Sequence, residues 1–188
     1  MQERNSQSEP SNCRNGRSPL LLRIASGAVA GFVATVLMDA AGTLFWERAM
    51  SPSVQKRERE VEPRFPLNVL GERIAQQLGF QSVEATGEQI STILHWGIGL
   101  GCGALHGAIA ESVRIERQML GLPIAAGMLA ADEFGFPAGG LCPWPAAFPW
   151  QTHARAAFAH AVYGITMALF YEGIRAWMAA ETEMRGTA

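Results

Sequence analysis

Five ionisable residues stand out because they lie inside or at the end of long stretches that carry no other charge. They are Asp39, His95, Asp132, Glu133 and His160. Imidazole titrates near neutrality, so carboxylates beside imidazoles can relay protons or hold a small cation. Placing such a group in lipid costs ~2.5–3.5 kcal/mol, so these side chains normally face the interior of a helix bundle and have a partner. The five residues therefore predict one shared polar site for protons or a small cation.

The same residues are compatible with three other roles. Two imidazoles and carboxylates on facing helices could bind a metal ion. His95 and His160 are also a candidate pair of haem ligands. In a purely structural role, Asp–His pairs would fix the order of the helices, and some side chains would reach toward the interface. Residue types and spacing do not choose among these roles, so the cofactor stays unknown.

Four apolar segments must position these residues, and they are predicted to be transmembrane helices over about 24–46, 89–111, 118–134 and 154–177. Residues 89–110 contain no Asp, Glu, Lys or Arg, and at ~1.5 Å per residue they can cross a ~30 Å hydrocarbon layer. Helices of a soluble bundle normally keep a polar face, which this segment lacks. A signal peptide is the alternative for the first segment, but its apolar run continues to Trp46. The sequence therefore predicts an all-α integral membrane bundle of four helices.

The remaining segments are polar and form the ends and one long connection. Residues 1–19 are predicted to be a disordered tail, 20–180 the transmembrane domain with the connection 47–88, and 181–188 a C-terminal tail. Within the connection, apolar residues recur at helical spacing at Leu67, Leu70, Ile74 and Leu78. This pattern predicts a short amphipathic helix that ends near Gly79 and lies on the membrane surface or against the protein.

The placement of Lys and Arg predicts the orientation in the membrane. The short loop 112–117 contains two Arg, whereas the loop 134–152 contains no Lys or Arg. Because positive residues favour the cytoplasmic side, we expect both termini to be cytoplasmic in a bacterial inner membrane. The net charge of −2 gives no basis for binding nucleic acid. The expected partner is the lipid bilayer.

Small residues at every fourth position mark one face of three predicted helices. These ladders include Gly27, Gly31, Gly99, Gly103, Gly107, Gly164 and Ala168. Small side chains let helix backbones approach closely in lipid, where no hydrophobic drive brings helices together. We therefore expect these residues to pack helices within the bundle. The same faces are compatible with a homo-oligomer or with a partner in a membrane complex.

An internal duplication would explain a second pattern. Asp39 and Asp132 each stand three residues before a glycine, near the end of the first and third segments. His95 and His160 each stand four residues before a glycine, near the start of the second and fourth. The chain is therefore compatible with two repeated helical hairpins related by an axis along the membrane normal.

Several short motifs resemble one known family. They are Trp46-Glu47, His95-Trp96, Gly103-Ala104, Glu111, the Pro/Gly-rich loop 135–149, and His160 with Tyr163-Gly164. In this order, from about Gly27 to Gly173, the chain resembles the YagU-like group of uncharacterised bacterial inner-membrane proteins. The resemblance implies a small multi-span membrane protein and brings no reaction or catalytic residue with it.

Enzyme motifs are missing from the sequence. It has no nucleophile elbow, no Walker loop and no His-Glu-x-x-His signature, and Gly97-x-Gly99-x-Gly101 lies in an apolar helix. A non-enzymatic function is therefore favoured, with proton or small-cation handling first. The alternatives are a structural or partner-binding membrane subunit and a subunit that carries a metal or haem.

Overall fold

The chain folds entirely into helices, as the sequence predicted. The computed structural model describes residues 19–113 and 116–186, and no strand occurs in this part of the chain. The predicted tail 1–19 lies outside the described residues except for Pro19. The elements are α1 (Leu20–Ala49), α2 (Pro52–Val61), α3 (Pro66–Gln77), α4 (Val83–Ile109), α5 (Arg117–Ala130), a π-helical turn (Ala131–Gly135), α6 (Phe136–Ala138), a 3₁₀ turn (Pro145–Ala147) and α7 (Trp150–Gly186). Because α7 continues to Gly186, most of the expected tail 181–188 is helical.

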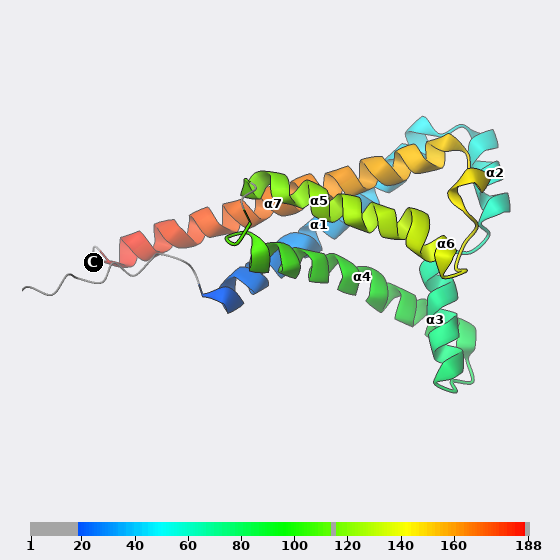
Figure 1. Ribbon diagram of the computed structural model, residues 1–188, viewed down its shortest axis with the longest axis horizontal. Coiled ribbons are helices and arrows are strands. Elements are labelled where there is room, and N and C mark those ends of the chain that lie inside the picture. The colour runs from blue at the N-terminus through cyan, green and yellow to red at the C-terminus, as the bar shows by residue number, and fades with distance from the viewer. Residues whose placement is uncertain (1–18, 114–115, 187–188) are drawn as a thin grey trace, which may run out of the picture.

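Four long helices form an elongated bundle with an open side. Helix α1 packs against α4 and α7, α7 also packs against α5, and α3 packs against α4. Helix α4 barely contacts α5, and Figure 1 shows these two helices diverging toward the end that carries α3. The divergence leaves space between α4 and α5. We call the end of the bundle that carries α3 the splayed end.

Glycines make the closest approach between α1 and α4. A Cβ on Gly103 would overlap the carbonyl oxygen of Gly27 and lie 2.7 Å from the Cα of Gly31. A Cβ on Gly99 would overlap Oγ1 of Thr35, and one on Gly107 would overlap the carbonyl oxygen of Arg23. Backbone therefore touches backbone along this crossing, as small residues on helix faces allow.

A second glycine crossing joins α5 and α7. A Cβ on Gly121 would overlap the carbonyl oxygen of Gly164 and lie 3.1 Å from the Cβ of Ala168. A Cβ on Gly164 would lie 2.9 Å from the Cβ of Ala125. Small residues thus form the contact between α1 and α4 and also the contact between α5 and α7. The same kind of contact is what two repeated hairpins would produce, although the repeat itself stays a prediction.

The interior of the bundle holds small and polar residues together with Leu120 and Met167, while many other large apolar side chains lie outside. Tyr163, Tyr171, His106 and Thr35 are among the largest fully buried side chains. The buried hydroxyl groups donate to backbone carbonyls, with Tyr163 Oη 2.6 Å from the Gly99 oxygen. The outer surface carries exposed Leu, Ile, Val and Phe side chains on all four long helices, such as Val29, Phe32, Ile93, Leu105, Leu122, Phe158 and Leu169.

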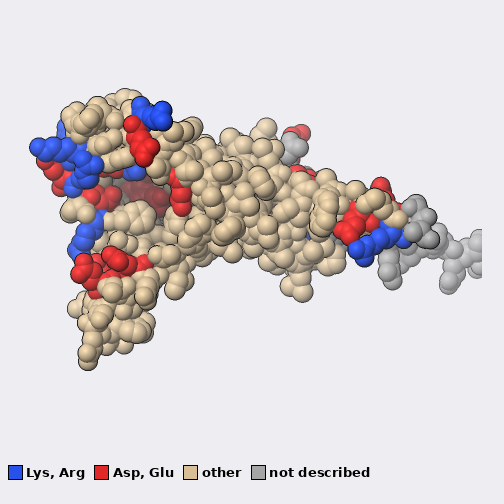
Figure 2. Space-filling view, turned by 180° about the vertical axis from the view of Figure 1, so that it is seen from behind, with Lys and Arg blue, Asp and Glu red and all other residues tan. Residues whose placement is uncertain are grey.

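Two helices of the described chain are long and apolar enough to cross a membrane. They are Leu20–Ala49 and Met119–Ala138, and only 33% and 17% of their most apolar windows is buried. Helices α4 and α7, which correspond to the predicted spans 89–111 and 154–177, are not among the two. On the face drawn in Figure 2, charged side chains gather toward the two ends and leave the middle without Lys, Arg, Asp or Glu.

The connection between α1 and α4 folds into two short helices at the splayed end. Proline occupies the first position of both α2 and α3, where its missing N–H costs no hydrogen bond. Helix α3 matches the predicted amphipathic helix, and Gly79 ends it with a φ of 78°. A Cβ on Gly71 would overlap the Gly87 oxygen of α4, so α3 packs on the protein. Arg73 then donates to the carbonyl oxygens of Gly139 and Gly140, at 2.8 and 2.6 Å.

Candidate functional site

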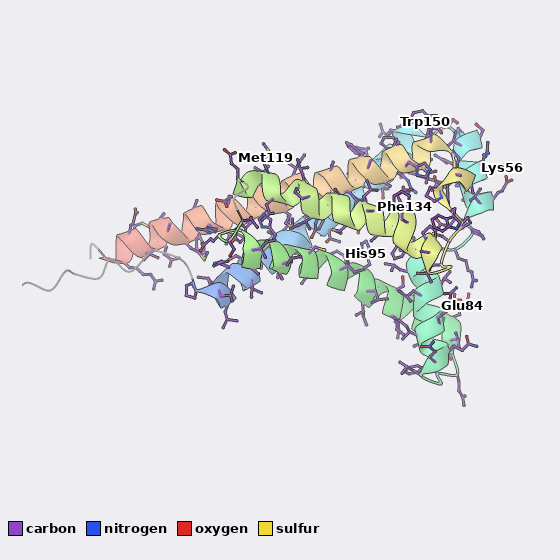
Figure 3. The ribbon with its side chains drawn as sticks, in the orientation of Figure 1. Lys56, Glu84, His95, Met119, Phe134 and Trp150 are labelled. Atoms are coloured by element: carbon purple, nitrogen blue, oxygen red, sulfur yellow. The ribbon has the colours of Figure 1, made fainter. Side chains whose placement is uncertain are left out.

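A large cavity lies at the splayed end, where α4 diverges from α5. Its volume is ≈ 1140 Å³, and its walls come from α1, α2, α4, α5, the π-helical turn, α7 and the loop around Pro143. His95 lies on the part of α4 that borders this space (Figure 3). All five residues of the predicted polar site line the cavity: Asp39, His95, Asp132, Glu133 and His160.

The first pair joins α1 and α4. Nε2 of His95 lies 3.0 Å from Oδ2 of Asp39, and the two side chains are 26% and 47% exposed. Trp96 stacks on Phe32 at 5.1 Å between ring centroids, which fixes the neighbouring turn of α4 against α1. The pair therefore sits on a rigid helix crossing while its polar atoms stay accessible from the cavity.

The second pair joins the π-helical turn and α7. Nε2 of His160 lies 3.3 Å from Oδ2 of Asp132, and Nδ1 of His160 lies 2.8 Å from the carbonyl oxygen of Ala156. A carbonyl oxygen only accepts hydrogen bonds, so Nδ1 carries a proton, and Nε2 accepts or donates according to its protonation state. His160 is nine-tenths buried, whereas the Asp132 side chain is 43% exposed. In each long-helix pair, an Asp on the first helix or in the turn that follows it thus meets a His on the second helix.

Glu133 has a different partner, His153, which lies outside the predicted set of five residues. Nδ1 of His153 lies 2.7 Å from Oε2 of Glu133, and its Nε2 lies 3.1 Å from the carbonyl oxygen of Pro145. The π-helical turn explains how neighbouring residues 132 and 133 both reach α7, because a π turn rotates less per residue than an α turn. His153 and His160 are seven residues apart, on one face of α7. His153 was not among the residues predicted for the site, because a local helical pattern does not show which loop folds over the helix.

A buried carboxylate from α2, which the sequence did not single out, completes the rim. Glu58 is 6% exposed, accepts a hydrogen bond from Thr152 Oγ1 at 2.5 Å, and pairs with Arg155 Nη2 at 2.5 Å. The Arg155 guanidinium also lies 5.1 Å from the centre of the Trp46 ring. These contacts dock α2 and the end of α1 on α7. The only sequence signal for the burial of Glu58 is that Val54 and Val61 stand four residues before it and three residues after it on the same helix.

Glu62, at the end of α2, is the fifth carboxyl group that lines the cavity, and its pKa is shifted. Burial, reinforced by the nearby carboxylates Glu58 and Asp132, raises the pKa of Glu62 from 4.5 to about 7, while Arg155 opposes the shift. Burial and the same acidic surroundings raise the pKa of the Cys142 thiol to about 11, so the thiolate is scarce at neutral pH.

The cavity has a surplus of carboxylates and no arrangement of ligands for a metal ion. Asp39, Glu58, Glu62, Asp132 and Glu133 line it, and Arg155 is the single Lys or Arg among the described lining residues. In residues 19–113 and 116–186, no three His, Cys, Asp or Glu side chains are grouped to hold a metal. Each Nε2 of His95 and His160 faces its own aspartate, so the pair does not fit the predicted haem ligation either.

The opposite end of the bundle contains a separate buried ion network. Glu111, in the turn that follows α4, pairs with Arg23 on α1 at 3.1 Å and with Arg175 on α7 at 2.6 Å, and its side chain is 8% exposed. Arg23 also donates to the carbonyl oxygens of Gly107 and Ala108. His106 packs edge-on against Tyr171 nearby. This network ties three helices together at the end of α4.

No family model, curated protein or solved structure matches the chain. The function of the protein is therefore inferred from the cavity and the side chains that line it.

Proposed function

We propose that this protein is a multi-span integral membrane protein of the bacterial inner membrane, related to the YagU-like group. The distribution of polarity supports residence in lipid. Small residues, two tyrosines and an ion network fill most of the interior beside Leu120 and Met167, while many Leu, Ile and Phe side chains are exposed on the outside of the bundle. A soluble bundle has the reverse arrangement, and its apolar helices are mostly buried. With both termini cytoplasmic, the cavity opens on the outer side.

Within that membrane protein, the cavity handles protons or small cations. Three carboxylate–imidazole pairs line it: Asp39–His95, Asp132–His160 and Glu133–His153. Each pair can hold one proton between two groups, and imidazole changes charge near neutral pH. A cation that binds there supplies the positive charge that the proton had supplied. Uptake of the cation and release of the proton are therefore coupled. The convergence of these pairs on one cavity is the observation that carries the proposal.

Proteoliposomes that contain the full-length protein and a trapped pH-sensitive dye test this function. With an imposed pH gradient and a potassium potential, we expect proton flux that Asp39→Asn and Asp132→Asn each reduce at least tenfold. Glu60→Gln removes an exposed carboxylate on the same end of the molecule and serves as the matched control. If both aspartate variants conduct like the wild type and differ only in thermal stability, the pairs have a structural role and the proposal is wrong.

A further inference from the structure

The lining of the cavity divides into a polar zone and an apolar zone. The carboxylates and imidazoles lie toward the splayed end, on the last turns of α1, the π-helical turn and the start of α7. Deeper between α4 and α5, the lining residues are Ile98, Gly99, Cys102, Leu105, Pro123, Ile124, Gly127 and Met128. From Ile98 to Leu105 this apolar slot extends for ~10 Å at ~1.5 Å per residue. A proton or a metal ion would leave such a slot unused.

The slot exists because α4 and α5 hardly touch. The glycines of these two helices that make close contacts face other partners. Those of α4 contact α1 or α3, and that of α5 contacts α7. A Cβ on Gly127 would meet no atom within 4 Å, so the wall of α5 leaves room opposite α4. The total volume of ≈ 1140 Å³ slightly exceeds the ~300–1,000 Å³ that sites for drug-sized ligands enclose. The space therefore suits an organic molecule with an apolar body.

The charges of the polar zone decide which organic molecule fits. Five carboxyl groups face one guanidinium and three imidazoles, and the guanidinium is already engaged by Glu58 and Trp46. An anionic or phosphate-bearing molecule would therefore meet the carboxylates of the three carboxylate–imidazole pairs and no free Arg. A positive centre would meet the Asp39 and Asp132 carboxylates, whose side chains are 47% and 43% exposed.

We infer that the cavity binds a lipophilic organic monocation, with its positive charge among the carboxylates and its apolar part in the slot between α4 and α5. This inference rests on the proposed function, because it names the class of cation that the carboxylate–imidazole site takes. The apolar slot supplies affinity by removing hydrocarbon from water, and the carboxylates supply selectivity for positive charge.

Tetraphenylphosphonium and tetraphenylborate give a direct test, because they have nearly the same shape and opposite charge. Full-length protein in detergent micelles is dialysed to equilibrium against each tritiated ion, and binding to protein-free micelles is subtracted. We expect saturable binding of tetraphenylphosphonium at one site per chain and no saturable binding of tetraphenylborate. Equal binding of the two ions would overturn the inference, because the carboxylates would then give no selectivity.

Two sets of variants locate the binding site. Gly127→Phe places a ring in the slot and should abolish saturable binding, whereas Gly101→Phe, where a Cβ also meets nothing within 4 Å and which lies outside the cavity, should leave binding unchanged. Asp39→Asn and Asp132→Asn should each weaken binding about tenfold, the effect of losing one nearby charge, and Glu60→Gln should not. Thermal unfolding of each variant in the same detergent verifies that it is folded. Full binding by folded Gly127→Phe protein would show that the slot is not the site.

The binding and flux experiments can fail separately. Proton flux that needs Asp39 and Asp132, without saturable binding of tetraphenylphosphonium, would leave the proposed function standing and overturn the inference about the substrate. Selective binding of tetraphenylphosphonium without any flux would support the cavity as a cation site and contradict proton coupling.

Discussion

Single residues in this protein combine burial and charge in two different ways. At the splayed end, carboxylates outnumber cations and several side chains stay open to the cavity. At the opposite end, Glu111 lies between two guanidinium groups and the network is compensated by close contacts. The splayed end, where carboxyl groups outnumber Lys and Arg, has the features of a ligand-binding site. The opposite end, where the charges are paired in close contacts, has the features of a structural ion network.

Glu62 should make stability depend on pH. Its pKa of about 7 exceeds the ordinary value of 4.5, so the folded protein holds this proton more tightly than the unfolded chain. The stability that this proton provides is therefore lost as the pH rises from 4.5 through 7. We expect Glu62→Gln to raise the free energy of unfolding by about 1 kcal/mol at pH 8, since partial exposure screens the effect, and by less at pH 5. Thermal unfolding in detergent at both pH values measures it, and equal gains at both would contradict it.

Glu111→Gln should be among the most destabilising single substitutions. The change removes the negative charge between Arg23 and Arg175 and leaves two buried cations without compensation. Breaking a buried ion pair in this way costs about 3–5 kcal/mol. Glu181→Gln, at an exposed pair with Arg185 on α7, is the control and should cost less than about 1 kcal/mol. Similar unfolding temperatures for the two variants would show that the network contributes little.

At the scale of the elements, glycines determine which helices pair. Helices α1 and α4 approach through Gly27, Gly31 and Gly103, and α5 approaches α7 through Gly121 and Gly164. Because these faces are used within each pair, α4 and α5 are left apart, and the cavity lies between them. The geometry of the site is thus a consequence of where small residues occur on each helix.

The same substitution at two glycines of α4 should have opposite effects. Gly103→Ala places a methyl group against the Gly27 carbonyl and the Gly31 Cα, so overpacking should cost about 1–3 kcal/mol. Gly101→Ala meets no atom within 4 Å and should stabilise the helix by about 0.5–1 kcal/mol. Unfolding temperatures of the two purified variants measure both effects. A neutral Gly103→Ala would mean that the two helices are not held in close contact.

At the scale of the whole molecule, the proposed residence in a membrane depends on where large apolar side chains lie. Val29, on α1, is 55% exposed, and it lies in the first half of one of the two helices long and apolar enough to cross a membrane. On a soluble protein an exposed Val can become Arg without harm. In the centre of a bilayer the same change costs about 2.5–3.5 kcal/mol.

Val29→Arg should therefore reduce the amount of protein in the membrane fraction severalfold. Leu21→Arg, at a residue that is 80% exposed near the start of α1, should be tolerated, because a long side chain there can reach the interface. Quantitative immunoblots of the membrane and soluble fractions compare the two variants. Val29→Arg protein that stays monodisperse without detergent would argue against lipid as the solvent of this surface.

The sequence by itself determined the elements and the types of residue at the site. Hydrophobic runs and proline positions are local, so the long helices, α3 and its end near Gly79 follow from neighbours along the chain. The five ionisable residues were found because charge is rare in apolar stretches, and all five line the cavity.

The tertiary structure decided which side chains pair across the helices and how large a cavity remains between them. Each imidazole has its own carboxylate, Glu58 is buried, and His153 faces Glu133, because helices far apart in the chain are docked there by loops. Pairing across helices depends on their crossing angle and rotation, which a one-dimensional pattern of small residues does not fix. The cavity depends on contacts that α4 and α5 do not make, and only the arrangement of all four long helices determines those.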